Sequence, residues 1–67
     1  MSIYLAVNEN GNEVISNIRL KRYENYWVDD FFGNDFDVNN VVYLPEGSIK
    51  KLINKKLTWE DDFIKIP

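Results

Sequence analysis

The chain has 67 residues, of which 45% are hydrophobic, and a formal net charge of −3 at pH 7. A chain this short is expected to fold as one domain, residues 1–67, with little room for an enclosed active site. It contains no cysteine and no histidine, which excludes disulfides, thiolate or imidazole metal sites, and Ser-His or Cys-His nucleophile pairs.

The first half of the chain predicts strands and a polar loop. Two apolar runs, at 3–7 and 13–16, flank a turn of Asn, Glu and Gly residues at 8–12, so a β-hairpin is expected. Apolar and charged residues then alternate over 17–27, which favours a third strand. The segment 28–40 mixes acids and asparagines with three phenylalanines and predicts an exposed loop held by some of its rings.

The second half predicts a strand, a helix and a final strand. Val41–Leu44 is apolar throughout and predicts an interior strand. Ser48 is expected to cap a short helix with apolar residues at i, i+3 and i+4, and Asn54 is expected to end it. The alternating run at 63–66 contains Lys65, which predicts an edge strand. The predicted fold class is α+β: a small antiparallel β-sheet of four to five strands with one short α-helix packed on it.

One set of oxygen donors has the spacing of a calcium loop. Asp35, Asp37 and Asn39 alternate, and Glu46 follows Asp35 by eleven residues. The sixth position is Asn40, where such loops require glycine, so an ordinary turn rich in Asn and Asp is favoured. Neither a metal nor a cofactor is predicted, although these four residues leave a metal site as an open alternative.

Adjacent carboxylates also occur at Asp29-Asp30 and at 60–62. Such groups act as an acid and base pair only where burial separates their pKa values, and a polar loop does not provide that burial. Thr58 and Asp61 have the spacing of a capping box and predict a short turn. No catalytic residue is predicted, and we expect that the chain is not an enzyme.

Basic residues give a second alternative, which is nucleic-acid binding. Lysines cluster around the predicted helix, and Arg19, Lys21 and Arg22 form another group beside tyrosines, as in some proteins that bind single strands. A sequence pI of about 4.7 argues against this function, because nucleic-acid binders are usually basic.

The favoured contact surface lies between residues 23 and 37, where aromatic and acidic residues alternate. A small domain does not bury every aromatic ring completely, and exposed tyrosine and tryptophan beside acids are typical of protein interfaces. The candidate contact residues are Tyr23, Tyr26, Trp27, Asp29, Asp30, Phe31, Phe32, Asp35 and Asp37. The alternative is that these rings are buried between copies of the chain in a homo-oligomer.

Residues 44–53, LPEGSIKKLI, with LTWED at 57–61, resemble the ends of small uncharacterised accessory proteins encoded by bacteriophages and prophages. The opening IYLAVN, followed by Gly11 and EVI at 13–15, is also similar, so that about half of the chain is covered. The resemblance brings no catalytic residues. It implies a protein that binds and modulates, by inhibition, a host protein such as a defence or nucleic-acid-processing enzyme.

The same resemblance implies the cytoplasm of a bacterial host as the location. The apolar stretch at 3–7 is too short for a signal-peptide core, and no run approaches the roughly 20 apolar residues of a membrane span. We therefore expect a cytoplasmic protein that does not contact a membrane.

Overall fold

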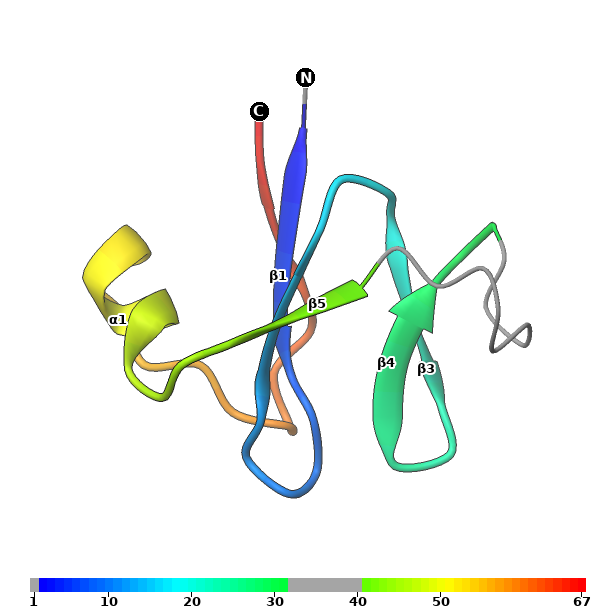
Figure 1. Ribbon diagram of the computed structural model, residues 1–67, viewed down its shortest axis with the longest axis horizontal. Helices are drawn as coiled ribbons and strands as arrows, with labels where there is room; N and C mark the ends of the chain where they lie inside the picture. Colours follow the sequence, from blue (N-terminus) through cyan, green and yellow to red (C-terminus); the bar gives the residue numbers. More distant parts are fainter. Residues whose placement is uncertain (1, 32–40) are drawn as a thin grey trace.

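The computed structural model describes residues 2–31 and 41–67, which contain two antiparallel sheets and one helix (Figure 1). The larger sheet has the order β5-β2-β1-β6, and the smaller one pairs β3 with β4. The elements are β1 (Ile3–Val7), β2 (Glu13–Ser16), β3 (Leu20–Tyr23), β4 (Tyr26–Asp29), β5 (Val41–Leu44), α1 (Ser48–Ile53) and β6 (Ile64–Ile66). The α+β class and the antiparallel sheet are confirmed. The described residues form six strands in two sheets instead of four or five strands in one.

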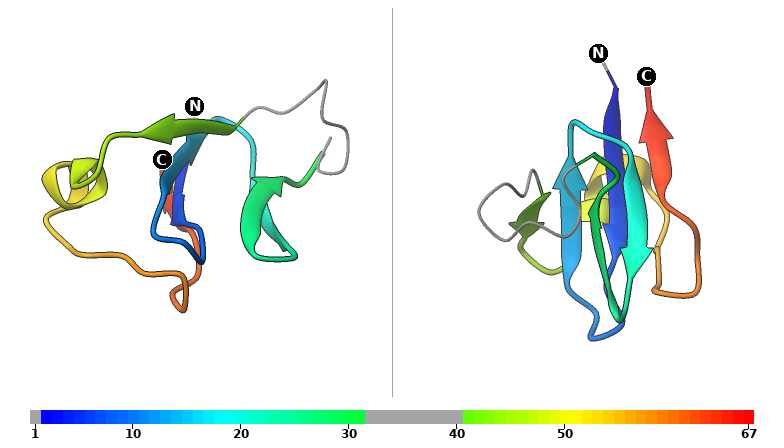
Figure 2. Two further views of the ribbon diagram at one scale, coloured as in Figure 1. Left: turned by 60° about the horizontal axis from the view of Figure 1, so that its bottom comes forward. Right: turned by 90° about the vertical axis from the view of Figure 1, so that its right-hand side faces the viewer.

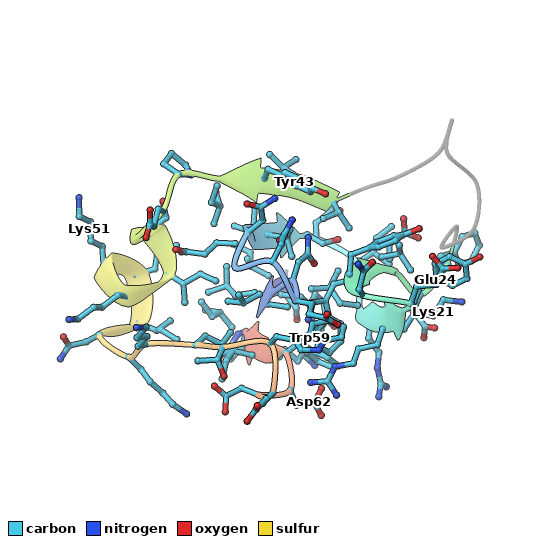
Figure 3. The ribbon with its side chains drawn as sticks, turned by 90° about the horizontal axis from the view of Figure 1, so that it is seen from below. Lys21, Glu24, Tyr43, Lys51, Trp59 and Asp62 are labelled. Carbon is cyan, nitrogen blue, oxygen red and sulfur yellow. The ribbon has the colours of Figure 1, made fainter. Side chains whose placement is uncertain are left out.

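The elements form three layers around the larger sheet. Seen along the strands, this sheet stands in the middle, with α1 on one side and the β3–β4 hairpin on the other (Figure 3). Figure 2 shows the same arrangement from two further directions. Because side chains alternate along a strand, β1, β2 and β5 each supply residues to both cores, whereas β6 supplies Ile64 and Ile66 to the helix-side core alone.

The core on the helix side contains the buried residues Leu5, Val7, Ile49 and Leu57. Ile49 comes from α1 and Leu57 from the segment that follows it, so both cover the face that carries Leu5 and Val7. Half-buried aliphatic residues of β2, β5, α1 and β6 surround these four. Ile49 and Ile53 dock the short helix as the sequence predicted, whereas Leu52, the i+3 residue of the predicted apolar face, is 59% exposed.

The core on the hairpin side contains Ala6, Val14, Leu20 and Trp27. Aromatic rings complete it, since Tyr4, Trp59 and Phe63 pack against these residues. Tyr4 and Phe63 meet edge to face at 5.6 Å between ring centroids. This side of the sheet is therefore packed with rings, whereas the helix side is packed with aliphatic chains.

The loop between β1 and β2 is the predicted hairpin turn. Asn8 N donates to Asn12 O at 2.8 Å, and Asn12 N donates to Asn10 Oδ1 at 3.0 Å. Gly11 has a φ of 92°, in the left-handed region that glycine enters without a steric penalty.

The prediction for residues 17–31 was wrong in two places, and the rest of the loop predicted over 28–40 lies outside the described residues. The strand expected over 17–27 is interrupted, because the chain reverses at Glu24 and Asn25 and returns as β4. Val28 and Asp29, expected in an exposed loop, are buried residues of β4. No glycine marks this turn, and Glu24 itself adopts a φ of 55°, so the usual sequence signal for a tight hairpin is missing.

The helix begins one residue earlier than predicted. Its N-cap is Gly47, with a φ of 89°, and the Ser48 hydroxyl donates to Pro45 O at 2.6 Å instead of capping the helix. The Glu13 carboxylate of β2 accepts hydrogen bonds from Gly47 N at 2.6 Å and Ile49 N at 2.7 Å. At the other end Asn54 is the C-cap, as predicted, with a φ of 56°.

The two edges of the larger sheet are β5 and β6. The edge position predicted for β6 is confirmed, and Lys65 is exposed there. The interior position predicted for β5 was wrong, because in the described part of the chain β5 pairs with β2 alone. Among the described residues, no helix has the length and apolar character needed to cross a membrane.

Candidate interaction surface

The predicted contact residues of β4 point in two directions. Tyr26 is half-buried, and the next residue, Trp27, lies on the opposite face of β4, which packs on the sheet. Trp27 is 3% exposed and Asp29 is fully buried. These two residues are therefore parts of the interior and not of the exposed surface that we expected.

Trp27 fastens the hairpin to the larger sheet. Its indole Nε1 donates to Val7 O at 2.9 Å, and its backbone N donates to Asn8 Oδ1 at 2.8 Å. Its ring meets Trp59 at 6.1 Å and Phe63 at 6.0 Å between centroids, both edge to face. Ring packing and the satisfied N–H groups explain why this tryptophan is inside.

Arg22 extends the same cluster to the turn before β6. Its guanidinium lies 4.7 Å from the centroid of the Trp27 ring and 5.0 Å from that of Trp59. Its Nη2 donates to Trp59 O at 2.8 Å and to Asp61 O at 2.9 Å. Arg22 thus links the hairpin to the Thr58–Asp61 turn, whose predicted capping interaction is present as Thr58 N and Oγ1 bonded to Asp61 Oδ2.

Three tyrosines of β3, β4 and β5 are at least partly accessible: Tyr23 and Tyr26 are half-buried and Tyr43 is exposed, and we call these three residues the tyrosine surface. The rings of Tyr23 and Tyr26 meet edge to face, with centroids 5.7 Å apart. Tyr43 belongs to β5, which lies against β4. Burial raises the pKa of Tyr26, and the charges of Glu24, Tyr23 and Tyr43 raise it further.

The sequence did not identify Tyr43 or its neighbour Val42 as contact residues. Tyr43 is 61% exposed and Val42 is 60% exposed, on opposite faces of β5. A run of four apolar residues predicts burial, and nothing in the run itself indicates an edge. Only the sheet order places these side chains at the surface.

The remaining predicted contact residues follow β4. Asp30 is exposed, and its N donates to Arg19 O at 2.7 Å. Phe31 is 76% exposed, and its N donates to Asp29 Oδ1 at 3.1 Å. Phe32, Asp35 and Asp37 lie outside the described residues.

The calcium spacing stays a sequence prediction. Asp35, Asp37 and Asn39 lie outside the described residues, and Glu46 alone is described. Within residues 2–31 and 41–67, no three His, Cys, Asp or Glu side chains gather as a metal site would require.

The basic residues do not share one surface. Arg19 and Arg22 lie over aromatic rings of the hairpin-side core, with the Arg19 guanidinium 5.6 Å from the Phe63 centroid. The lysines at 50, 51, 55 and 56 are exposed on α1 and just after it, on the opposite side of the sheet (Figure 1). This separation gives little support to a continuous path for a nucleic-acid backbone.

A groove of about 670 Å³ lies between the β1–β2 turn, the start of α1 and the segment 56–60. Glu9, Glu46 and Glu60 line it with exposed carboxylates, and Lys50 and Lys56 contribute the opposite charge. The half-buried carboxylate in the groove, Glu13, is already bonded to the backbone of the helix start. The groove is therefore lined by charges of both signs. The Glu13 carboxylate stabilises the start of α1 and is engaged there.

No protein-family model, curated protein or solved structure matches this chain. Its function is therefore inferred from its own residues and their positions.

Proposed function

We propose that this chain is an accessory protein of the bacteriophage or prophage type that binds a host protein and modulates it, with inhibition as the expected effect. It acts in the cytoplasm of a bacterial host, on a defence enzyme or a nucleic-acid-processing enzyme, and catalyses no reaction itself. The observation that carries this proposal is the tyrosine surface, in which exposed Tyr43 and its neighbour Val42 belong to β5, an edge strand among the described residues.

Tyrosine is suited to this role for physical reasons. Its ring offers a large contact area with few rotatable bonds, and its hydroxyl is satisfied either by water or by a partner. Tyr23 and Tyr26 already support each other through their edge-to-face contact. A partner would therefore meet rings that are partly ordered before binding, which lowers the entropy lost on association.

The charges around the tyrosine surface favour a basic partner. Glu24 is exposed and acts electrostatically on Tyr26, and Asp30 is exposed at the end of β4. Among the described residues 23–31 and 41–48, three exposed residues are acidic, Glu24, Asp30 and Glu46, and none is Lys or Arg. Such a field speeds the approach of a basic surface and repels an acidic one.

A homo-oligomer is the second candidate function. The observation that favours it is that β5, an edge strand among the described residues, exposes Val42 and Tyr43, because apolar side chains at a sheet edge can pack on their counterparts in another copy. In that case Val42 and Tyr43 would be covered by their own counterparts. Nucleic-acid binding is the weaker alternative, since Arg19 and Arg22 are engaged with rings.

The test is a pull-down of the tagged protein from bacterial host lysate, with nuclease-treated lysate in parallel. Tyr26→Ala and Tyr43→Ala are compared with the wild type and with Leu52→Ala, a matched control that removes an equally exposed apolar side chain from α1. We expect one host protein to be retained after nuclease treatment, lost with either tyrosine variant and kept with the control.

Light scattering of the same variants separates the alternatives. A monomeric mass for the wild type, together with a retained host protein, supports the proposal. Recovery of the bait alone with a multimeric mass that falls in Tyr43→Ala would replace it with self-assembly. Proteins that are lost on nuclease treatment would indicate nucleic acid as the ligand.

A further inference from the structure

Asn10 is the one asparagine in the sequence that glycine follows directly, since every other asparagine precedes a residue with a side chain. The pair Asn10-Gly11 lies in the loop between β1 and β2, which projects from one end of the larger sheet (Figure 1). Both residues are exposed there. An amide side chain and the main-chain nitrogen of a residue without a Cβ are therefore neighbours on the surface.

The Asn10 side chain turns back toward the main chain that follows it. Its Oδ1 accepts a hydrogen bond from Asn12 N at 3.0 Å. This bond closes a small ring that contains both Cγ of Asn10 and the main-chain nitrogen of Gly11. It also draws electrons from the Cγ carbonyl, which makes this carbon a better electrophile. The turn thus keeps an electrophilic carbon near the next nitrogen of the chain.

Gly11 leaves the approach to its nitrogen open. Its φ is 92°, and a Cβ built on it would meet nothing within 4 Å. The nitrogen is therefore screened neither by a side chain of its own residue nor by other described segments packed beside that position. Glycine is the residue that permits such a close approach to the main chain.

We propose that Asn10-Gly11 is a site of spontaneous modification, at which Asn10 is deamidated to aspartate and isoaspartate. The Gly11 nitrogen loses its proton and attacks Cγ, an N–Cγ bond forms, and the bond from Cγ to the side-chain nitrogen breaks. That nitrogen takes up a proton and leaves as ammonia, and a cyclic succinimide remains. Water then opens the ring: attack at Cγ gives aspartate, and attack at the main-chain carbonyl carbon gives isoaspartate.

One hydrogen bond opposes the reaction. Gly11 N donates to Asn8 O at 2.9 Å, so the nitrogen must be released before it attacks. The bond belongs to a turn in which residues 9–12 are exposed, and the main-chain bonds of such turns open at a small part of the global free energy of unfolding. The turn therefore slows the reaction without preventing it, and the folded chain reacts more slowly than the unfolded one.

The two products differ in what they do to the turn. Glu9 N donates to Asn25 O at 3.1 Å, which ties the β1–β2 turn to the turn of the β3–β4 hairpin. Isoaspartate at position 10 adds a carbon atom to the main chain one residue after this bond, whereas aspartate keeps the main chain as it was. We expect the Glu9 amide to exchange its hydrogen about tenfold faster or more in the isoaspartate product and to be nearly unchanged in the aspartate product.

The test is incubation of the full chain at mildly alkaline pH, which favours loss of the proton from the Gly11 nitrogen. Mass spectrometry of proteolytic peptides follows the replacement of –NH₂ by –OH at each asparagine, and chromatography against synthetic peptides separates aspartate from isoaspartate. We expect Asn10 to react about tenfold faster or more than Asn25 and Asn54, which are exposed but precede bulky residues. This comparison requires no variant.

The matched variants are Gly11→Ala and Gly47→Ala. Both add a methyl group to a glycine in the left-handed region, with φ values of 92° and 89°, and neither methyl group meets a neighbour within 4 Å. Both variants therefore carry similar backbone strain, but Gly11 alone follows an asparagine. We expect Gly11→Ala to slow the deamidation of Asn10 by about tenfold or more and Gly47→Ala to change it by less than about twofold.

Three results would overturn the proposal. The first is an Asn10 that reacts no faster than Asn25 and Asn54, and the second is an equal rate in Gly11→Ala and the wild type. The third is an Asn10 that stays intact in the folded chain while the chain unfolded in urea is modified, because the hydrogen bond of Gly11 would then block the attack. None of these measurements uses a host protein, so the outcome is independent of the proposed function.

Discussion

The larger sheet is flanked by α1 on one face and by the β3–β4 hairpin on the other. Both are attached to it by hydrogen bonds as well as by apolar packing, but they differ in the side chains that they leave exposed. On one side the Glu13 carboxylate receives the N–H groups of Gly47 and Ile49. On the other side Asn8 Oδ1 and Val7 O receive the N–H groups of Trp27. Each layer is thus fixed by hydrogen bonds that cross between elements, in addition to its apolar packing.

The difference lies in what packs around those bonds. The hairpin is covered on its inner face by Trp27, Trp59 and Phe63, with Arg22 against two of the rings. The helix has two turns and aliphatic contacts, and it leaves Leu52, Val42 and Ile3 exposed on its side of the sheet. We infer that most of the free energy of unfolding depends on the hairpin side, because large rings bury the most apolar area.

Trp27→Ala is the strongest test of that comparison. Removing a buried tryptophan typically costs about 3–5 kcal/mol, which approaches the whole stability of a domain of this size. We expect the variant to be largely unfolded by circular dichroism at room temperature. The control is Tyr26→Ala, the adjacent residue on the opposite face of β4, which should cost less than about 1 kcal/mol in urea unfolding. Equal losses for the two variants would contradict the division between the two faces of β4.

Glu13→Ala tests the helix side in the same way. It removes the acceptor of two N–H groups at the start of α1, which should cost about 1–3 kcal/mol. Hydrogen exchange should become faster in α1, while the amides of β3 and β4 keep their protection. Glu9→Ala, at an exposed position in the neighbouring turn, is the control. Loss of protection in the hairpin as well would mean that the two layers are not attached independently.

Arg22→Lys measures the link between the hairpin and the turn before β6. Lysine retains the charge but cannot place a planar group between two rings while donating to the carbonyls of Trp59 and Asp61. We expect a loss of about 0.5–1 kcal/mol in urea unfolding, because the site is exposed. The control is Lys21→Arg on the opposite face of β3. A variant as stable as the wild type would show that the contact does not stabilise the fold.

The smallest expected effect is a pH-dependent one at Asp61. Hydrogen bonds from Thr58 N and then from its hydroxyl hold the pKa of Asp61 below its usual value of 3.8, and Lys55 adds to this. A lowered pKa in the folded state contributes stability above about pH 4, which is lost as the pH falls through the folded pKa. Asp61→Asn should therefore lower the melting temperature at neutral pH by a small amount, and the difference should narrow below about pH 4.

The control for Asp61 is the Thr58→Ala background, which lacks the hydroxyl donor. There the effect of Asp61→Asn should be smaller than in the wild type, because one of the two hydrogen bonds is already absent. If the melting temperatures of Asp61→Asn and its parent differ by the same amount from neutral to acid pH, the ionised carboxylate is not the source of the effect.

Local patterns were sufficient for the elements that depend on neighbouring residues. The polar turn at 8–12, the short helix α1, Asn54 at its end and the Thr58–Asp61 turn are all present where the sequence predicted them. Each of these features is determined by the φ preferences or the short-range hydrogen bonds of residues within about one turn of one another. The same holds for β6, where Lys65 indicated an edge strand.

Only the tertiary structure decided which residues are interior and which are available for contact. Tyr26 and Trp27 are adjacent aromatic residues, yet Tyr26 is half-buried and Trp27 is only 3% exposed. The alternation of side chains along a strand does not by itself say which of its two faces is packed. Glu13 replaced Ser48 as the partner of the helix start because the order of the sheet places β2 beside it. β5, as apolar as an interior strand, lies at an edge because sheet order is a property of long-range pairing.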